Sequence, residues 1–176
     1  MSLLAFTMCS LSLISAVDAG DIQVTVSPPW TLVLVPSGKE GAAAAGQQVA
    51  VAPPDVVAVR DERHDAIPVW DPKAAGIFRG AHLDQMVTAE CTAAGTLVSG
   101  TVRVKSGPGD AAVYTEGKDY ALDPFWGRVG RLETSAIPDG GPSYVDYRCA
   151  KQRLDSVVLD ASGKAVVRRG TPAMGV

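Results

Sequence analysis

The sequence predicts an all-β fold: an antiparallel β-sandwich-like domain with long irregular loops, behind an N-terminal signal peptide. Short apolar runs alternate with polar residues at a period of two, which is typical of half-buried strands. Turn signals recur roughly every 8 to 12 residues, the spacing of sandwiches and barrels. Twelve prolines and eighteen glycines are spread along 176 residues, which disfavours long helices.

The predicted strands of the N-terminal half are short and separated by prolines. Residues 22–26 alternate Ile and Val with polar neighbours, and 31–35 resume after two prolines that cannot continue a ladder. Two further strands are expected at 47–51 and 55–60. Proline and glycine punctuate residues 61–85, for which we expect a long ordered loop, and such loops are often functional.

The C-terminal half has a stronger β-pattern with clearer turns. The 106–110 segment is a turn with glycine on both sides of Pro108, and Gly140 after Pro138-Asp139 supplies the positive φ that a tight turn needs. The expected strands are 86–92, 96–106, 111–115, 120–123, 126–133, 143–149, 153–160 and 165–169.

The first 19 residues resemble a signal peptide. An uncharged, largely apolar run is followed by small residues that allow cleavage after Ala19, although no Lys or Arg precedes the run. A buried strand or helix is the alternative. The predicted organisation is a signal peptide at 1–19, a β-rich domain at 20–170, and at 171–176 the start of a linker. We therefore expect an extracytoplasmic protein, periplasmic or secreted, with no membrane span after cleavage.

Two cysteines, Cys91 and Cys149, would remain after cleavage, since Cys9 leaves with the leader. An even pair in an exported domain is a candidate disulfide. Two buried free thiols, which behave as small hydrophobic side chains, are the alternative.

The sequence gives little sign of catalysis or of nucleic-acid binding. The formal net charge is −3 and the basic residues are scattered, so no nucleic-acid partner is expected. There are two histidines, no Gly-x-Ser-x-Gly elbow, no spacing of zinc ligands and no phosphate-binding loop. We expect no cofactor, no metal and no catalytic residue in this chain.

The candidate binding residues are His64, Trp70, Arg79 and Trp126. His64 belongs to a charged run, 60–65, that could form the lip of a site with Trp70 as its floor. Trp126 lies at a turn–strand junction and could stack on sugar rings. The alternative is a solvated turn, with the aromatic rings in the core.

Four segments carry a family resemblance: "ERHDAIPVWDPKAAGIFRG", "ECTAAGTLVSGTVRVKSGPG", "EGKDYALDPFWGRVGR" and "YVDYRCAKQRLDSVVLDASGKAVVRRGTP". They resemble the non-catalytic region that precedes the catalytic domain of bacterial secreted SGNH/GDSL-type hydrolases. The resemblance implies an accessory β-domain that positions substrate or partner, with polysaccharide as a ligand. It also implies a C-terminal catalytic domain in the same polypeptide, because the nucleophile and Asp-x-x-His blocks of that family have no match here.

The pattern "EGKDY…WG…GR…IPDG…YVDY" is also similar to small β-modules of phage and surface structural proteins. The alternative function is therefore a self-standing cell-surface or phage-like assembly module that associates through its sheet edges.

Overall fold

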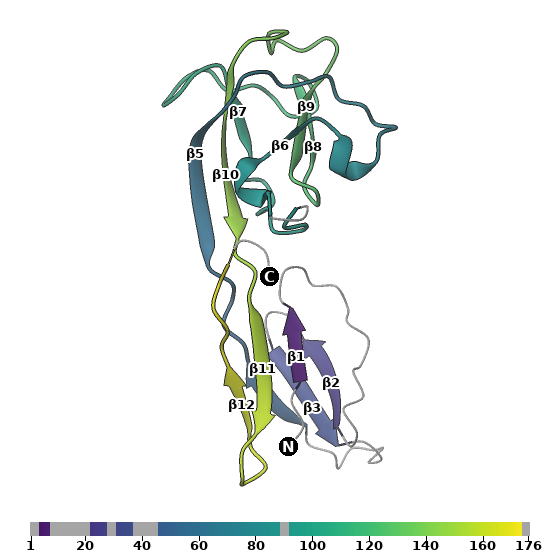
Figure 1. Ribbon diagram of the computed structural model, residues 1–176, viewed down its shortest axis with the longest axis vertical. Helices are drawn as coiled ribbons and strands as arrows, with labels where there is room; N and C mark the ends of the chain where they lie inside the picture. Colours follow the sequence, from purple (N-terminus) through teal and green to yellow (C-terminus); the bar gives the residue numbers. More distant parts are fainter. Residues whose placement is uncertain (1–3, 8–21, 28–30, 37–45, 89–91, 174–176) are drawn as a thin grey trace. The chain divides into compact units, whose positions relative to one another are not determined.

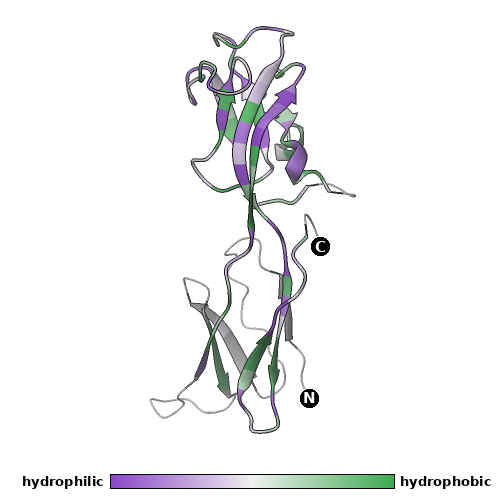
Figure 2. Ribbon diagram, turned by 90° about the vertical axis from the view of Figure 1, so that its left-hand side faces the viewer, coloured by the Kyte–Doolittle hydropathy of each residue, from purple (hydrophilic) through white to green (hydrophobic). Residues whose placement is uncertain are grey.

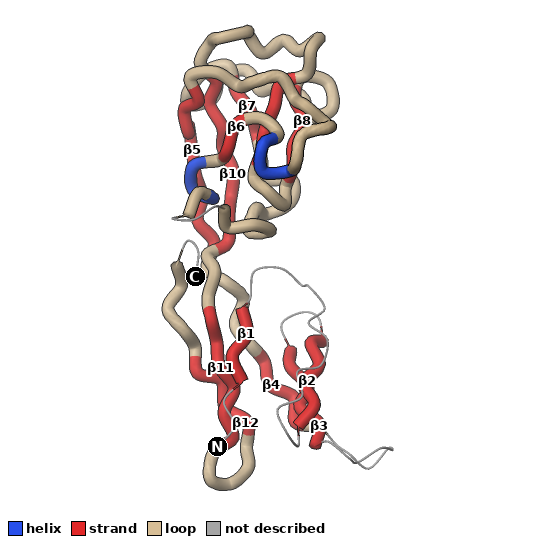
Figure 3. The backbone as a smooth tube through the Cα atoms, turned by 45° about the vertical axis from the view of Figure 1, so that its right-hand side comes forward, coloured by secondary structure: helices blue, strands red, loops and turns tan. Residues whose placement is uncertain are grey.

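The computed structural model describes residues 4–7, 22–27, 31–36, 46–88 and 92–173. The chain divides into two compact units. Unit 1 comprises Met1–Pro54 and Arg153–Pro172, and unit 2 comprises Asp55–Gln152 and Ala173–Val176. In the described residues both units consist of strands and loops, with two single-turn 3₁₀ helices in unit 2 (Figures 1 and 3).

Unit 1 contains two three-stranded antiparallel sheets, ordered β1-β11-β12 and β2-β3-β4. The strands are β1 (Leu4–Thr7), β2 (Ile22–Ser27), β3 (Thr31–Pro36), β4 (Gln47–Ala50), β11 (Leu154–Leu159) and β12 (Ala165–Arg168). Leu32, Leu34, Val51, Val157 and Ala165 form its buried core. Both sheets contribute to this core, so each buries one apolar face.

The Gln47 side chain ties β4 to the β11–β12 hairpin. Its Nε2 donates to the Gly163 carbonyl (2.7 Å) and its Oε1 accepts from the Ala165 N–H (2.8 Å). The hairpin turn is set by Asp160, whose carboxylate accepts from the Ser162 and Lys164 N–H groups, and by Gly163 at φ 80°. A side-chain amide thus replaces backbone pairing between these segments.

Unit 2 also contains two three-stranded antiparallel sheets, ordered β5-β10-β7 and β6-β9-β8. The strands are β5 (Val56–His64), β6 (Ala81–His82), β7 (Arg103–Lys105), β8 (Tyr120–Asp123), β9 (Arg128–Arg131) and β10 (Ser143–Ala150). The 3₁₀ helices are η1 (Gly76–Phe78) and η2 (Asp84–Met86).

The core of unit 2 lies between its two sheets. Its buried members are Ile67, Leu83, Met86, Leu97, Val102, Val104, Tyr120, Val129, Ile137, Val145, Tyr147 and Cys149. Hydrophobic and hydrophilic residues alternate along the strands (Figure 2), and β10 alternates buried with more exposed positions over its whole length. This is the pattern expected of strands that cover a core on one face.

The predicted all-β antiparallel fold is confirmed. Three predicted strands are wrong, and the loop expected at 61–85 is shorter, because β5 extends to His64 and β6 covers Ala81–His82. Of residues 86–92 the structure describes 86–88 and 92, and these are not in a strand, because Met86 ends η2 and an isolated bridge joins Val87 to Thr92. Residues 111–115 make a single bridge, Lys105 to Val113, and the strand expected at 96–106 is reduced to β7. In each case turn-forming residues and long-range contacts outweigh a local apolar pattern.

The leader and the cysteines have mixed outcomes. Of residues 1–19 the structure describes Leu4–Thr7, which form β1 and pair with β11; cleavage after Ala19 stays a prediction.

Cys149 is a free thiol, wholly buried in the core of unit 2. Its side chain packs as a small hydrophobic group, so the predicted disulfide is not found at Cys149; Cys91 lies outside the described residues.

Candidate functional site

A β-bulge in strand β5 shapes the outer face of the β5-β10-β7 sheet. Val59 pairs with Tyr147 and Glu62 with Val145, so Arg60 and Asp61 both stand opposite Asp146. Asp61 has φ 55°, the single positive φ of a non-glycine residue in the described part of the chain. Because one residue is added, the inward-facing positions change from odd to even numbers after the bulge.

The Lys105 side chain lies against both carboxylates of the bulge, those of Asp61 and Asp146. Its Nζ lies 2.5 Å from Asp61 Oδ1 and 2.7 Å from Asp146 Oδ1, and donates to the Gly109 carbonyl (3.1 Å). Asp61 Oδ1 also accepts from the Gly109 N–H, and Asp146 Oδ1 accepts from the Asp61 N–H. The ammonium group therefore has three acceptors for its three protons, which is what a side chain only 4% exposed requires.

These contacts shift the ionisation of all three groups towards the charged form. Burial alone would lower the pKa of Lys105, but hydrogen bonds to Asp146 and Asp61 outweigh it and raise that pKa. Hydrogen bonds from Lys105 and the Gly109 N–H lower the pKa of Asp61. Burial opposes ionisation of Asp146, yet the bond from Lys105 holds its pKa below the ordinary value. The cluster is a stable ion triad at neutral pH.

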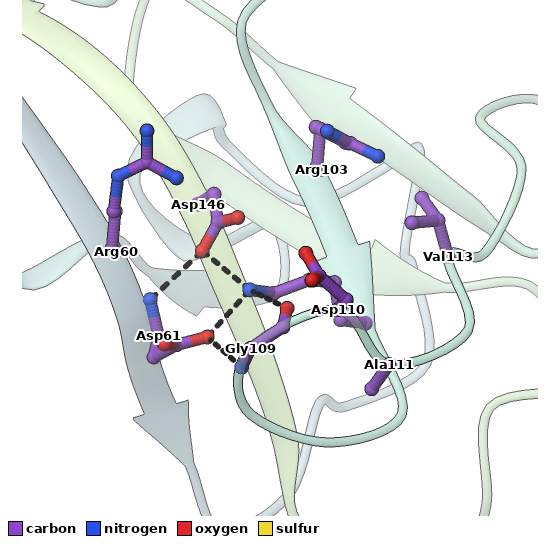
Figure 4. Close-up of a pocket in the computed structure, with 9 residues that line it drawn as sticks. Arg60, Asp61, Arg103, Gly109, Asp110, Ala111, Val113 and Asp146 are labelled. Carbon is purple, nitrogen blue, oxygen red and sulfur yellow. Dashed lines mark hydrogen bonds and ion pairs between the residues drawn. The ribbon is translucent and has the colours of Figure 1, made fainter.

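A polar pocket of about 390 Å³ opens above this triad. Arg60 and Arg103 rise from β5 and β7 on either side of it (Figure 4), and Asp110 lies on the loop that Gly109 anchors. A second hollow of about 180 Å³ shares both arginines and adds Arg148. The guanidinium groups of these three arginines make no hydrogen bond or ion pair with any residue that the structure describes.

His64, a predicted binding residue, lies on the opposite, inner side of β5. Its Nε2 is 2.9 Å from Glu62 Oε1, and both side chains are less than a tenth exposed. Glu62 also accepts from the Tyr147 hydroxyl (2.5 Å) and from the Asp84 N–H that begins η2. Burial would raise the pKa of Glu62, but these hydrogen bonds lower it. The arrangement gives His64 a structural role, joining η2 to the sheet.

The other three predicted residues, Trp70, Arg79 and Trp126, come together on the β6-β9-β8 side of unit 2. The Arg79 guanidinium carbon lies 6.0 Å from the centre of the Trp70 ring, within cation–π range. Arg79 Nη1 forms an ion pair with Asp123 Oδ2 (3.2 Å), and the other carboxylate oxygen of Asp123 accepts from the backbone N–H of Trp126. Asp123 thus links the two tryptophans.

Two exposed aromatic rings adjoin this cluster. Phe125 is 49% exposed and meets Trp126 edge to face, with ring centres 5.0 Å apart. Phe78 is 72% exposed and ends η1, the turn whose Gly76 lies against the Trp126 indole. A Cβ at Gly76 would come within 2.1 Å of Trp126, so this close approach requires glycine. We call Trp70, Phe78, Arg79, Phe125 and Trp126 the aromatic surface.

The sequence prediction placed Arg60 and Asp61 in the charged run 60–65 that could form the lip of a site. It did not select Phe78, Arg103, Lys105, Asp146 or Arg148. The alternation of Arg103 and Lys105 with valines does indicate a strand face. The ion pairs of Lys105 with Asp61 and Asp146, each about forty residues away in the sequence, depend on the order of the strands in the sheet. For Phe78, the glycines that flank η1 were the available signal of a protruding turn.

In the described ranges, no group of three or more His, Cys, Asp or Glu residues is placed to hold a metal ion. Nor does any helix within them have the length and apolarity needed to cross a membrane. Comparison with known proteins gives no match to any family model, to any curated protein or to any solved structure.

Proposed function

We propose that this protein is a non-catalytic, extracytoplasmic binding module that holds carbohydrate against the aromatic surface of unit 2. One observation carries the proposal: two strongly exposed phenylalanines adjoin a tryptophan–arginine–aspartate cluster in a protein of which only 6% of residues are aromatic. Exposed aromatic patches on small soluble domains mark binding sites, and Trp and Arg are the residues most enriched at binding hot spots.

Carbohydrate fits the chemistry of this surface. The C–H faces of a pyranose ring pack on aromatic rings such as Phe78 and Phe125, whereas its hydroxyls need planar hydrogen-bond partners at the edge. Arg79, a third exposed, supplies donors there. Trp126 is held in advance by its backbone hydrogen bond to Asp123 and by its contact with Gly76, and Phe125 packs edge to face against it, which lowers the entropic cost of binding.

The proposed setting is an accessory domain of an exported SGNH/GDSL-type esterase or a related carbohydrate-active hydrolase. The four sequence segments that resemble the region ahead of the catalytic domain in such hydrolases support this setting. The lack of a recognisable nucleophile–base pair in the sequence also supports it. In that setting the module would position polysaccharide for a catalytic domain in the same polypeptide.

The test is binding of the purified chain to immobilised and soluble polysaccharides, followed by tryptophan fluorescence and by calorimetry. We expect saturable binding that weakens about tenfold in Phe78→Ala and in Phe125→Ala, since each removes a largely exposed ring worth about 1–2 kcal/mol of contact. Both variants should keep the far-ultraviolet circular dichroism of the parent.

Val166→Ala is the matched control, because Val166 is a comparably exposed apolar residue of unit 1. Its binding should equal that of the parent chain. Binding to no polysaccharide, or equal binding by the Phe78→Ala variant, would remove the basis of the proposal.

The alternative, an assembly module that associates through sheet edges, is less well supported by β5. This edge strand carries a bulge and the charged side chains of Arg60, Asp61 and Arg63, which are the devices that prevent edge-to-edge pairing. Light scattering coupled to size exclusion, over a hundredfold range of concentration, separates the two functions: reversible oligomers would favour assembly.

A further inference from the structure

The outer face of the β5-β10-β7 sheet carries positive charge that no contact explains. Arg60, Arg103 and Arg148 lie on three adjacent strands and are all exposed. They line two hollows that share Arg60 and Arg103. We call these three residues the arginine face.

The sheet register holds the three guanidinium groups near one another. Arg103 pairs directly with Asp146 across β7 and β10, and Arg148 lies two positions along β10 on the same face. The bulge places Arg60 opposite Asp146 as well. Arg148 is a diagonal neighbour of each of the other two, at roughly 7–8 Å, and Arg60 and Arg103 stand on either side of β10, about 10 Å apart. An extended ligand could contact all three.

The carboxylates of Asp61 and Asp146 lie under this face but form no ion pair with its three arginines. Asp61 and Asp146 are held by Lys105 and by backbone N–H groups. Asp110, on the rim, is the remaining acidic side chain of the pocket. The four basic side chains and three acidic side chains of the two hollows leave a formal charge of about +1 on the face, with the three guanidinium groups outermost, although the protein has a formal charge of −3. Arginine binds carboxylate and phosphate groups in a bidentate manner, and sulfate offers it the same oxygen geometry.

We propose that the arginine face is a second binding site, specific for the anionic groups of an acidic polysaccharide. The ligand class follows from two properties of the face. Its two hollows lie over residues of three adjacent strands, which suits an extended chain, and guanidinium groups border both of them, beside a smaller apolar lining. The choice of polysaccharide over other polyanions rests on the proposed carbohydrate-binding function.

The experiment measures binding of the full chain to polygalacturonate, dextran sulfate and neutral dextran by calorimetry at several salt concentrations. We expect one or both acidic polymers to bind more tightly than dextran. Arg60→Gln and Arg103→Gln should each weaken that binding about tenfold, the value of one charge-assisted contact. Each should also reduce the slope of log affinity against log salt by about one.

Comparison of polygalacturonate with dextran sulfate distinguishes a carboxylate-specific site from a sulfate-specific one. Arg168→Gln, an exposed arginine of β12 in unit 1, is the control and should bind as the parent does. Equal affinity for acidic and neutral polymers, or unchanged affinity in the double variant Arg60→Gln/Arg103→Gln, would overturn the inference. Equal or tighter binding of polyphosphate or single-stranded DNA through the same arginines would overturn the ligand class.

The two sites fail independently. If Phe78→Ala and Phe125→Ala have no effect while the arginine variants do, the aromatic surface is not a carbohydrate site, but the arginine face still binds acidic polymer. If only the phenylalanine variants lose binding, the arginine face has no such role.

Discussion

Replacing Arg153 with methionine should destabilise unit 1 by about 3–5 kcal/mol, because it leaves a buried carboxylate without its counter-charge. Arg153 and Asp155 are 1% and 0% exposed. Their contact is bidentate, with Nε to Oδ1 at 2.7 Å and Nη2 to Oδ2 at 2.8 Å. Arg153 also donates to the carbonyls of Ala52 (2.7 Å) and Pro53 (3.3 Å).

The magnitude follows from what the variant leaves behind. Asp155 would keep one hydrogen bond, from the Gly170 N–H at 2.9 Å, and two carbonyls would lose a charged donor. Small domains have a total free energy of unfolding of about 5–15 kcal/mol, so the loss is a large fraction of it. In the double variant Arg153→Met/Asp155→Leu, apolar side chains replace both charges, and most of the lost stability should return.

The pH dependence gives a second readout. The hydrogen bonds from Arg153, against the effect of burial, hold the pKa of Asp155 below its ordinary value. Its contribution to stability is therefore complete above the unfolded pKa of about 3.9 and is lost as pH falls through the folded pKa. In Arg153→Met, burial without the arginine raises that pKa, so protonation relieves the variant. The difference between parent and variant should therefore shrink between pH 7 and pH 3.

Urea denaturation followed by circular dichroism measures the free energy, and hydrogen exchange at residues 154–168 assigns the loss to unit 1. Arg168→Met is the control, an exposed arginine that should cost less than about 0.5 kcal/mol. A loss below 1 kcal/mol in Arg153→Met, or a difference that does not change with pH, would show that the ion pair is not the buried anchor described above.

Two further predictions concern the core of unit 2. Tyr147→Phe removes the hydroxyl that donates to Glu62 and accepts from the Gln85 N–H. It should lower the free energy of unfolding, measured in urea, by about 1–3 kcal/mol. Tyr144, which is only partly buried, is the control, and Tyr144→Phe should leave that free energy unchanged. Burial, with the Glu62 charge, raises the pKa of the Cys149 thiol. In a Cys9→Ser/Cys91→Ser background Cys149 should therefore react with maleimide only at the rate of unfolding, and rapid labelling of the native protein would contradict this.

The sequence was sufficient to predict the fold class and nine of the strands at approximately their observed positions, because these strands alternate apolar and polar residues between clear turn signals. Strand β10 is the clearest example, since its inward residues are visible in "SYVDYRC". The prediction was wrong at the start of 86–92, where Met86 is the last residue of the 3₁₀ turn η2 and Val87 follows it. The Glu62 carboxylate fixes that turn by accepting from the Asp84 N–H, a contact between residues 22 apart.

The candidate surfaces were only partly predictable. Trp70, Arg79 and Trp126 were chosen individually from composition, and the structure brings them together through Asp123, which no local pattern identifies. His64 belongs to a charged run, 60–65, whose composition suggests a solvent-exposed segment. Which of its residues face the core was not predictable, because the bulge changes the inward-facing positions from odd to even numbers.

The bulge at Arg60 and Asp61 therefore determines several properties of unit 2 at once. The added residue turns Glu62 and His64 inward, where they fix η2. It also brings the Asp61 carboxylate against Lys105 and leaves Arg60 on the outer face, across β10 from Arg103. A strained residue at a sheet edge is retained when its surroundings compensate for the strain, and here the Asp61 N–H and carboxylate are both bonded. The same irregularity thus disfavours pairing along the edge of β5 and contributes Arg60 and Asp61 to the pocket on the outer face, for which we propose an anionic ligand.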